Sequence, residues 1–117
     1  MRILFDKNVP VGVRRFLPNH EVRTFDETGW PIQLENGELL KSAEAAGFDV
    51  LVTSDQNIQY QQNLAARNLA LLVLGSNIWP IVRNHRAEIS AKTDAATPGS
   101  YEFIEMTLPP KPHRIDD

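Results

Sequence analysis

Four short apolar segments, separated by stretches long enough to form helices, constrain what this chain can fold into. The segments lie at residues 2–5, 20–25, 50–53 and 69–74, and the last of them, LALLVL, is the most apolar run in the sequence. Strands that alternate with helices in this way form parallel sheets with helices packed on both faces. We therefore expect an α/β fold with three layers, α/β/α, and a mostly parallel central sheet.

Local signals predict where the other elements begin and end. Asn8 and Pro10 favour a helix start, because asparagine can cap a helix and proline suits its first turn. This helix should end before Pro18. Asn36 is expected to cap a helix over 36–46, which Gly47 terminates. The remaining expected elements are a loop over 26–35, helices over about 57–67 and 79–91, and an edge strand over 101–108.

Length and composition indicate one domain in a soluble, cytoplasmic protein. The chain has 117 residues, no cysteine and a net charge of −3. The lack of cysteine excludes disulfides, zinc–thiolate sites and thiol nucleophiles. No stretch approaches ~20 apolar residues, so no membrane span is expected. We predict a single domain over residues 1–108, followed by a flexible C-terminal tail over 109–117. The tail has the sequence PPKPHRIDD, which contains three prolines.

Two acids follow directly after predicted strands. Asp6 comes after the first strand, and Asp55 lies two residues beyond Thr53, the last residue of the third. The carboxyl ends of parallel strands meet at one rim of a sheet, so both acids should lie there. The long connection over 26–35 can bring the start of the following helix, and with it Glu38, towards the same rim. Each acid also has a structural explanation, as a strand stop, a helix cap or a favourable charge in a first helical turn.

The chemistry of these side chains predicts a site for a hard divalent cation. Carboxylates that converge repel one another unless a cation lies between them. Oxygen ligands without neighbouring histidine or cysteine suit Mg²⁺ or Mn²⁺. Such ions polarise phosphoryl oxygens and activate water, which together give phosphodiester hydrolysis. Nearby side chains that can hold substrate or water without adding negative charge are Asn8, Asn57, Tyr60, Gln61 and Gln62.

Three segments, "ILFDKNVP", "NGELLKSAEAAGFDVLVTSDQN" and "YQQNLAARNLALLVL", resemble the small PIN-like domains of the PIN nuclease superfamily. Many of those domains belong to bacterial toxin–antitoxin modules. The resemblance runs from Met1 to about Pro80. It implies an endoribonuclease dependent on Mg²⁺ or Mn²⁺, with RNA as substrate and an antitoxin protein as partner. It also implies that Asp6, Glu38 and Asp55 are the catalytic, metal-binding acids. Independently, the open sheet edges and the apolar last strand allow a homodimer.

Two positions depart from the family pattern and leave an alternative open. Many relatives have glutamate after the first aspartate, where this chain has Lys7, and a second aspartate two places after the third acid, where it has Asn57. The alternative is a non-catalytic PIN-like binding module with a degenerate metal site, in which the Lys7 ammonium takes the place of the cation. A phosphatase or phospho-acceptor domain is a third interpretation, since Asp-x-Asn-Val is similar to the haloacid dehalogenase motif, although Asn8 stands where that motif has an acid.

Overall fold

The computed structural model describes residues 1–58 and 64–107, which form one mixed α/β unit around a five-stranded, all-parallel sheet. The strand order is β2-β1-β3-β4-β5, the flavodoxin-like order of doubly wound sheets, with its switch point between β1 and β3. The first four predicted strands are confirmed to within one residue at each end, whereas the last, expected over 101–108, ends at Ile104. Their bounds are Arg2–Phe5 (β1), Glu21–Thr24 (β2), Val50–Thr53 (β3), Ala70–Leu74 (β4) and Tyr101–Ile104 (β5).

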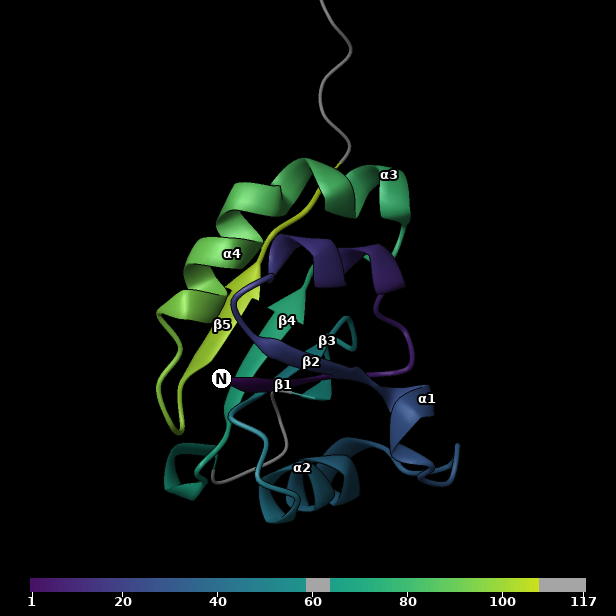
Figure 1. The fold of residues 1–117 in the computed structure, drawn as a ribbon, viewed down its shortest axis with the longest axis vertical. Helices are drawn as coiled ribbons and strands as arrows, with labels where there is room; N and C mark the ends of the chain where they lie inside the picture. The colour runs from purple at the N-terminus through teal and green to yellow at the C-terminus, as the bar shows by residue number, and fades with distance from the viewer. Residues whose placement is uncertain (59–63, 108–117) are drawn as a thin grey trace, which may run out of the picture.

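Helical segments cover both faces of this sheet, as Figure 1 shows. Side chains alternate between faces along each strand, so Ile3 and Phe5 join one buried cluster and Leu4 joins the other. The first cluster packs against η1, α3 and α4, and the second against α1 and α2. The bounds of the helical segments are Val11–Phe16 (η1), Phe25–Thr28 (α1), Asn36–Ala45 (α2), Leu64–Ala66 (η3), Trp79–Val82 (α3), Arg83–His85 (η4) and Arg86–Asp94 (α4).

One connection has the opposite hand to its neighbours. The β1-to-β2 connection runs outward to one edge of the sheet and the β4-to-β5 connection runs outward to the other, yet η1 and α4 pack on the same face. Two crossovers that run in opposite directions over the same face have opposite hands, so one of these two connections is left-handed. Connections between parallel strands are almost always right-handed. Because α3 and α4 lie over the first cluster, they leave the other side of β5 uncovered, and Phe103 there is 40% exposed.

Three local expectations were wrong. The first helix is a 3₁₀ helix with Pro10 at its N-cap, and Asn8 does not cap it. The predicted loop over 26–35 contains the end of α1, because Thr24 and Glu27 form a capping box. Asn36 is not the cap of α2: Glu35 holds that position, and Asn36 has a φ of 54°, which asparagine tolerates better than most residues.

Other expectations were partly met. The expected 79–91 helix is divided into α3, η4 and α4 and extends to Asp94. Residues 59–63 of the expected 57–67 helix lie outside the described residues, as does the predicted tail over 109–117; of the described part, Leu64–Ala66 forms the 3₁₀ helix η3. Within the described ranges, no helix is long and apolar enough to cross a membrane.

Glu27 in α1 and Glu44 in α2 each accept hydrogen bonds from an arginine and from a backbone N–H. The Thr24 backbone N–H, together with the Arg14 guanidinium at 2.7 Å, holds the pKa of Glu27 below its ordinary value. In the same way, the Asn68 N–H and the Arg67 guanidinium lower the pKa of Glu44 in α2. Both carboxylates therefore favour the folded chain while they are ionised.

Candidate metal and phosphodiester site

Asp6 lies at the carboxyl end of β1, where the strand order reverses. Its backbone N–H donates to the Val52 carbonyl of β3 at 2.8 Å, which continues the sheet one residue past the strand. The side chain is only 7% exposed. One carboxylate oxygen accepts the Lys7 backbone N–H and the other accepts the Thr53 hydroxyl, each at 2.7 Å. Asp6 is thus a buried carboxylate held by two neutral donors.

Thr53 connects Asp6 to Asp55. Its fully buried hydroxyl donates to Asp6 and accepts the Asp55 backbone N–H at 3.0 Å. The Asp55 carboxylate turns back to accept the Asn57 N–H at 3.0 Å, which forms an Asx turn. One hydroxyl therefore fixes both strand-end acids relative to each other. The structure brings Asp6 and Asp55 together, as the sequence predicted.

Asn8 has a positioning role at this rim. Its side-chain oxygen accepts the Ser54 backbone N–H at 3.1 Å, so it joins the loop after β1 to the loop after β3. An N–H can only donate, so the atom that faces it must be the amide oxygen, and the amide nitrogen keeps its two donors. Asn57, by contrast, is exposed and follows Asp55 on the outer side of the turn.

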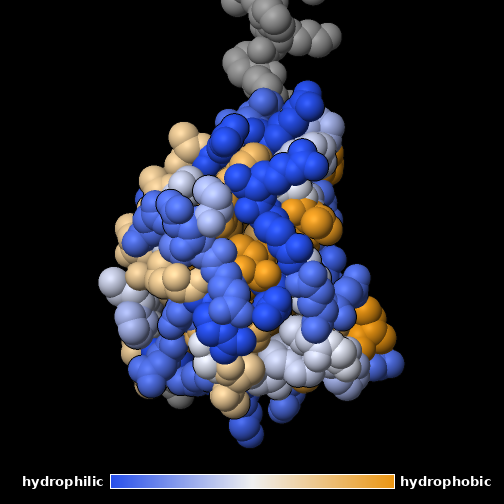
Figure 2. Space-filling view, in the orientation of Figure 1, coloured by the Kyte–Doolittle hydropathy of each residue, from blue (hydrophilic) through white to orange (hydrophobic). Residues whose placement is uncertain are grey.

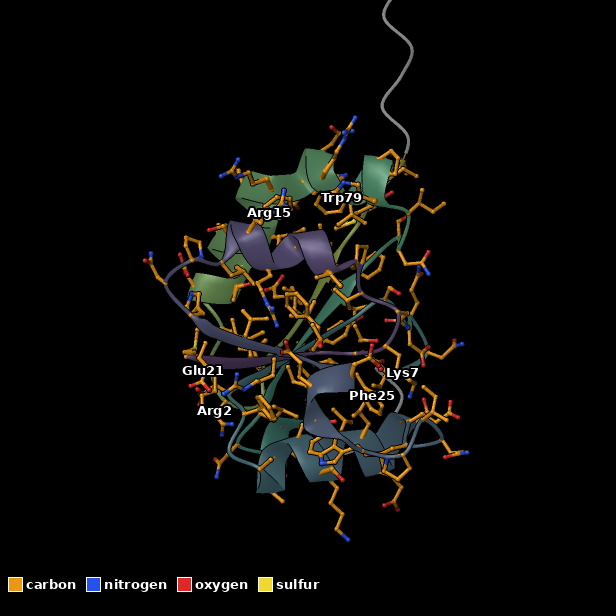
Figure 3. The ribbon with its side chains drawn as sticks, turned by 45° about the vertical axis from the view of Figure 1, so that its right-hand side comes forward. Arg2, Lys7, Arg15, Glu21, Phe25 and Trp79 are labelled. Atoms are coloured by element: carbon orange, nitrogen blue, oxygen red, sulfur yellow. The ribbon has the colours of Figure 1, made fainter. Side chains whose placement is uncertain are left out.

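The Lys7 ammonium is bound by other groups than Asp6. It donates to the Leu34 carbonyl at 2.5 Å and lies 4.4 Å from the centre of the Phe25 ring (Figure 3). Among the residues that the structure describes, no lysine, arginine or histidine forms an ion pair with Asp6. The structure therefore shows no Lys7–Asp6 ion pair of the kind that the alternative of a degenerate metal site expects. The reason is that the segment before α2 offers Lys7 a carbonyl and an aromatic face.

The Lys7–Leu34 contact also locates the start of α2. Leu34 comes just before the helix, so this bond places the N-terminal end of α2 at the carboxyl rim. Glu38 lies in the first turn of α2 and is exposed. No group of three or more histidine, aspartate or glutamate side chains in residues 1–58 and 64–107 is arranged to hold a metal ion. Glu38 is therefore near the rim without completing a three-acid cluster with Asp6 and Asp55.

The predicted substrate-binding residues Tyr60, Gln61 and Gln62 lie outside the described part of the chain. Trp30, which could have stacked on a base, is half-buried and packs edge-on against Phe25 and Phe48. Trp30 is thus a packing residue of the second buried cluster.

Asp26 is a rim acid that the sequence reasoning missed. It lines a cavity of about 60 Å³ together with Asp6, Lys7 and Thr24. It lies two residues beyond the end of β2, the same offset that Asp55 has from the end of β3. The rule that selected Asp6 and Asp55 would therefore have selected it too. It was overlooked because the predicted loop gave it no position relative to the sheet.

The order β2-β1-β3 means that an acid follows each of three adjacent parallel strands.

No protein-family model matches this chain. No curated protein and no solved structure matches it either. A strand order is shared by proteins of many activities, so the function has to be inferred from the chemistry of the rim.

The donors at this rim fit a hard divalent cation in type, though they are few. Asp6 and Asp55 offer carboxylate oxygens, and the second Asp55 oxygen has no hydrogen bond among the described contacts. Mg²⁺ is commonly held by one or two protein carboxylates and keeps several waters. A buried carboxylate without a cationic partner is also costly unless its charge is compensated. The residues therefore fit one hydrated Mg²⁺ or Mn²⁺ ion better than a pair of ions.

Proposed function

We propose that this chain is a metal-dependent endoribonuclease of the PIN-like type. The observation that carries the proposal is the Asp6 carboxylate, which is buried at the switch point, accepts only neutral donors and has Asp55 beside it. Ligands of doubly wound sheets bind at this switch point. A bound cation would compensate the charge that the described protein contacts leave uncompensated.

Asp6 and Asp55 are the residues that would hold one Mg²⁺ or Mn²⁺ ion. When bound, such an ion polarises a phosphoryl oxygen and makes water a better nucleophile. The chain's own residues supply the positioning. Thr53 joins the Asp6 carboxylate to the Asp55 backbone, and Asn8 joins the loops that carry the two acids. In this proposal, the exposed Glu38 orients the attacking water from the first turn of α2, and Asn57 holds substrate.

The finer assignments belong to the same proposal. The helices on both faces of the parallel sheet are consistent with a three-layer, PIN-like α/β/α fold. The resemblance of the segments around Asp6 and Asp55 supports a toxin of a toxin–antitoxin module, with RNA as substrate and an antitoxin as protein partner. Such a protein would act in the bacterial cytoplasm.

RNA cleavage by purified protein in Mg²⁺ or Mn²⁺ tests the proposal. Wild type should cut single-stranded RNA, and Asp6→Asn and Asp55→Asn should each lower the rate by about a hundredfold or more, because each removes a ligand charge. Asp94→Asn is the matched control, since Asp94 ends α4 at the opposite rim of the sheet, where it pairs with His20 before β2, and it should retain the wild-type rate. Equal rates in all four proteins, or no cleavage by wild type across varied RNAs, would refute the nuclease assignment.

One observation favours the alternative of a non-catalytic PIN-like binding module. The described residues contain no three-acid metal group, whereas the resemblance implies three acids. Calorimetric titration with Mn²⁺ separates the two functions. A Mn²⁺ site that Asp6→Asn abolishes contradicts the binding module, and a folded wild type that binds no Mn²⁺ supports it.

A further inference from the structure

Three arginines on the η1 and α4 side of the molecule have no acidic partner among the residues that the structure describes. Four other arginines each lie within 4 Å of a glutamate oxygen: Arg2 and Arg23 pair with Glu21, Arg14 with Glu27, and Arg67 with Glu44. Within residues 1–58 and 64–107, Arg15, Arg83 and Arg86 form no ion pair at all. Uncompensated positive charge therefore gathers on one helical layer of a chain whose net charge is −3.

Two of these arginines line a groove between η1 and α4. We call it the arginine groove and define it by Arg15, Phe16, Asn19, Asn84, Arg86 and Ser90; its volume is about 570 Å³. Figure 2 shows strongly hydrophilic side chains over this upper part of the molecule, and Figure 3 places Arg15 beside Trp79 on the same layer. Cationic and amide side chains lie in this lining next to the apolar side chains of Phe16, Pro18 and Ala87.

Packing beneath the groove holds one of its cations in place. The Arg86 guanidinium lies 5.6 Å from the centre of the Phe16 ring, and that ring stacks on Trp79 with centroids 5.8 Å apart and planes inclined by 19°. Gly12 in η1 allows this close packing, since a Cβ there would lie 2.5 Å from the Trp79 ring. A guanidinium that rests against a ring keeps its N–H donors for a ligand, and the contact reduces the freedom that would be lost on binding.

We propose that the arginine groove binds the phosphodiester backbone of single-stranded RNA. The choice of RNA rests on the proposed nuclease function, while the anionic character of the ligand follows from the groove itself. Arginine binds phosphate through two parallel hydrogen bonds, and it does so better than any other side chain. Asn84 donates its amide N–H to the Pro80 carbonyl at 3.1 Å, so its side-chain oxygen is left to accept from a base or a ribose hydroxyl.

The chain connectivity joins this groove to the acid rim. η1 starts five residues after Asp6 and leads to Arg15 and Phe16. Its six residues span about 12 Å at ~2 Å per residue. Val11, the first residue of η1, lines the same cavity as Asp6, and the arginine groove begins at Arg15, four residues further along this helix.

Binding of a fluorescent 12-nucleotide single-stranded RNA in EDTA, measured by anisotropy across a salt series, tests the proposal. The double variant Arg15→Gln/Arg86→Gln should weaken binding by about tenfold or more. It should also reduce the slope of log K against log salt by about 1.4, because each lost phosphate contact removes ~0.7. The control Arg23→Gln/Lys41→Gln removes the same net charge from β2 and α2, and it should change affinity less than threefold.

A charge reversal covers the case in which the double variant does not fold. Arg15 is exposed and no described contact involves its side chain, so Arg15→Glu should fold and still weaken RNA binding by more than tenfold. Wild-type affinity in the groove variants, or an equal loss in the control, would overturn the proposal. Tighter binding of poly-L-glutamate than of RNA by wild type would also overturn it, in favour of an acidic protein ligand.

Cleavage and binding can fail separately. EDTA removes any need for a metal in the binding assay. A protein that binds RNA through the groove and cuts none would contradict the nuclease assignment and leave the groove assignment standing. If cleavage depends on Asp6 but RNA binding does not depend on Arg15 and Arg86, the nuclease assignment stands and the groove assignment is contradicted.

Discussion

Replacing Thr53 by valine should destabilise this protein although valine fits a buried strand at least as well as threonine. Thr53 is fully buried in β3, and its hydroxyl donates to Asp6 at 2.7 Å while accepting the Asp55 N–H at 3.0 Å. A hydrogen bond to a charged acceptor contributes about 1.5–3 kcal/mol. The Asp55 N–H, left without a partner in a half-buried loop, adds about 1 kcal/mol. The extra methyl group offsets ~1 kcal/mol at most. The free energy of unfolding should therefore fall by about 1.5–3 kcal/mol.

Urea unfolding at pH 7, followed by tryptophan fluorescence and circular dichroism, measures this change as a lower midpoint with an unaltered slope. Thr53→Ser is the matched control, because it keeps the hydroxyl and loses one methyl group, at a cost of about 1 kcal/mol. Thr53→Val should thus be the less stable of the two. A double-mutant cycle with Asp6→Asn should give a coupling energy of about 1 kcal/mol or more. If Thr53→Val is as stable as Thr53→Ser or more stable, or if the coupling energy is near zero, the hydrogen bond from the Thr53 hydroxyl to Asp6 does not stabilise the folded protein.

Three further predictions concern the surroundings of the rim and the helices. Lys7→Met should cost about 1 kcal/mol through the lost bond to Leu34 and leave Mn²⁺ affinity unchanged within threefold by calorimetry, since its ammonium forms no ion pair with Asp6. A large change in affinity would contradict this. Glu44→Gln should be less stable than wild type at pH 7. Because the pKa of Glu44 in the folded protein lies below its ordinary 4.5, the difference in urea midpoint should be constant above that pH and vanish as the pH falls through the folded value. A difference that stays the same throughout the acid range would contradict this. Gly12→Ala should displace the Trp79 ring from Phe16, lower stability by about 1–3 kcal/mol and shift the tryptophan emission. Unchanged emission and stability would show that the Trp79 ring can move aside without cost.

The sequence alone predicted the parallel sheet and two of the rim acids, because both depend on local information. Apolar runs such as Val50–Thr53 and Ala70–Leu74 are buried on both faces, so their positions follow from hydrophobicity without knowledge of the rest of the chain. Once strands are parallel, residues that follow them must share a rim, which is why Asp6 and Asp55 could be placed together. The same rule applied to the strand ending at Thr24 would also have found Asp26.

Only the tertiary structure decided where individual side chains point. Lys7 stands next to Asp6 in the sequence, yet a carbonyl and an aromatic ring from residues 18 or more positions away draw its ammonium elsewhere. Asn8 has the residue type of a helix cap, but the loop after β3 offers it a backbone N–H instead. The pairing of η1 with α4, which creates the arginine groove, depends on which face the β4-to-β5 connection crosses. These outcomes depend on contacts between segments far apart in the chain, and local periodicity and capping signals carry no information about such contacts.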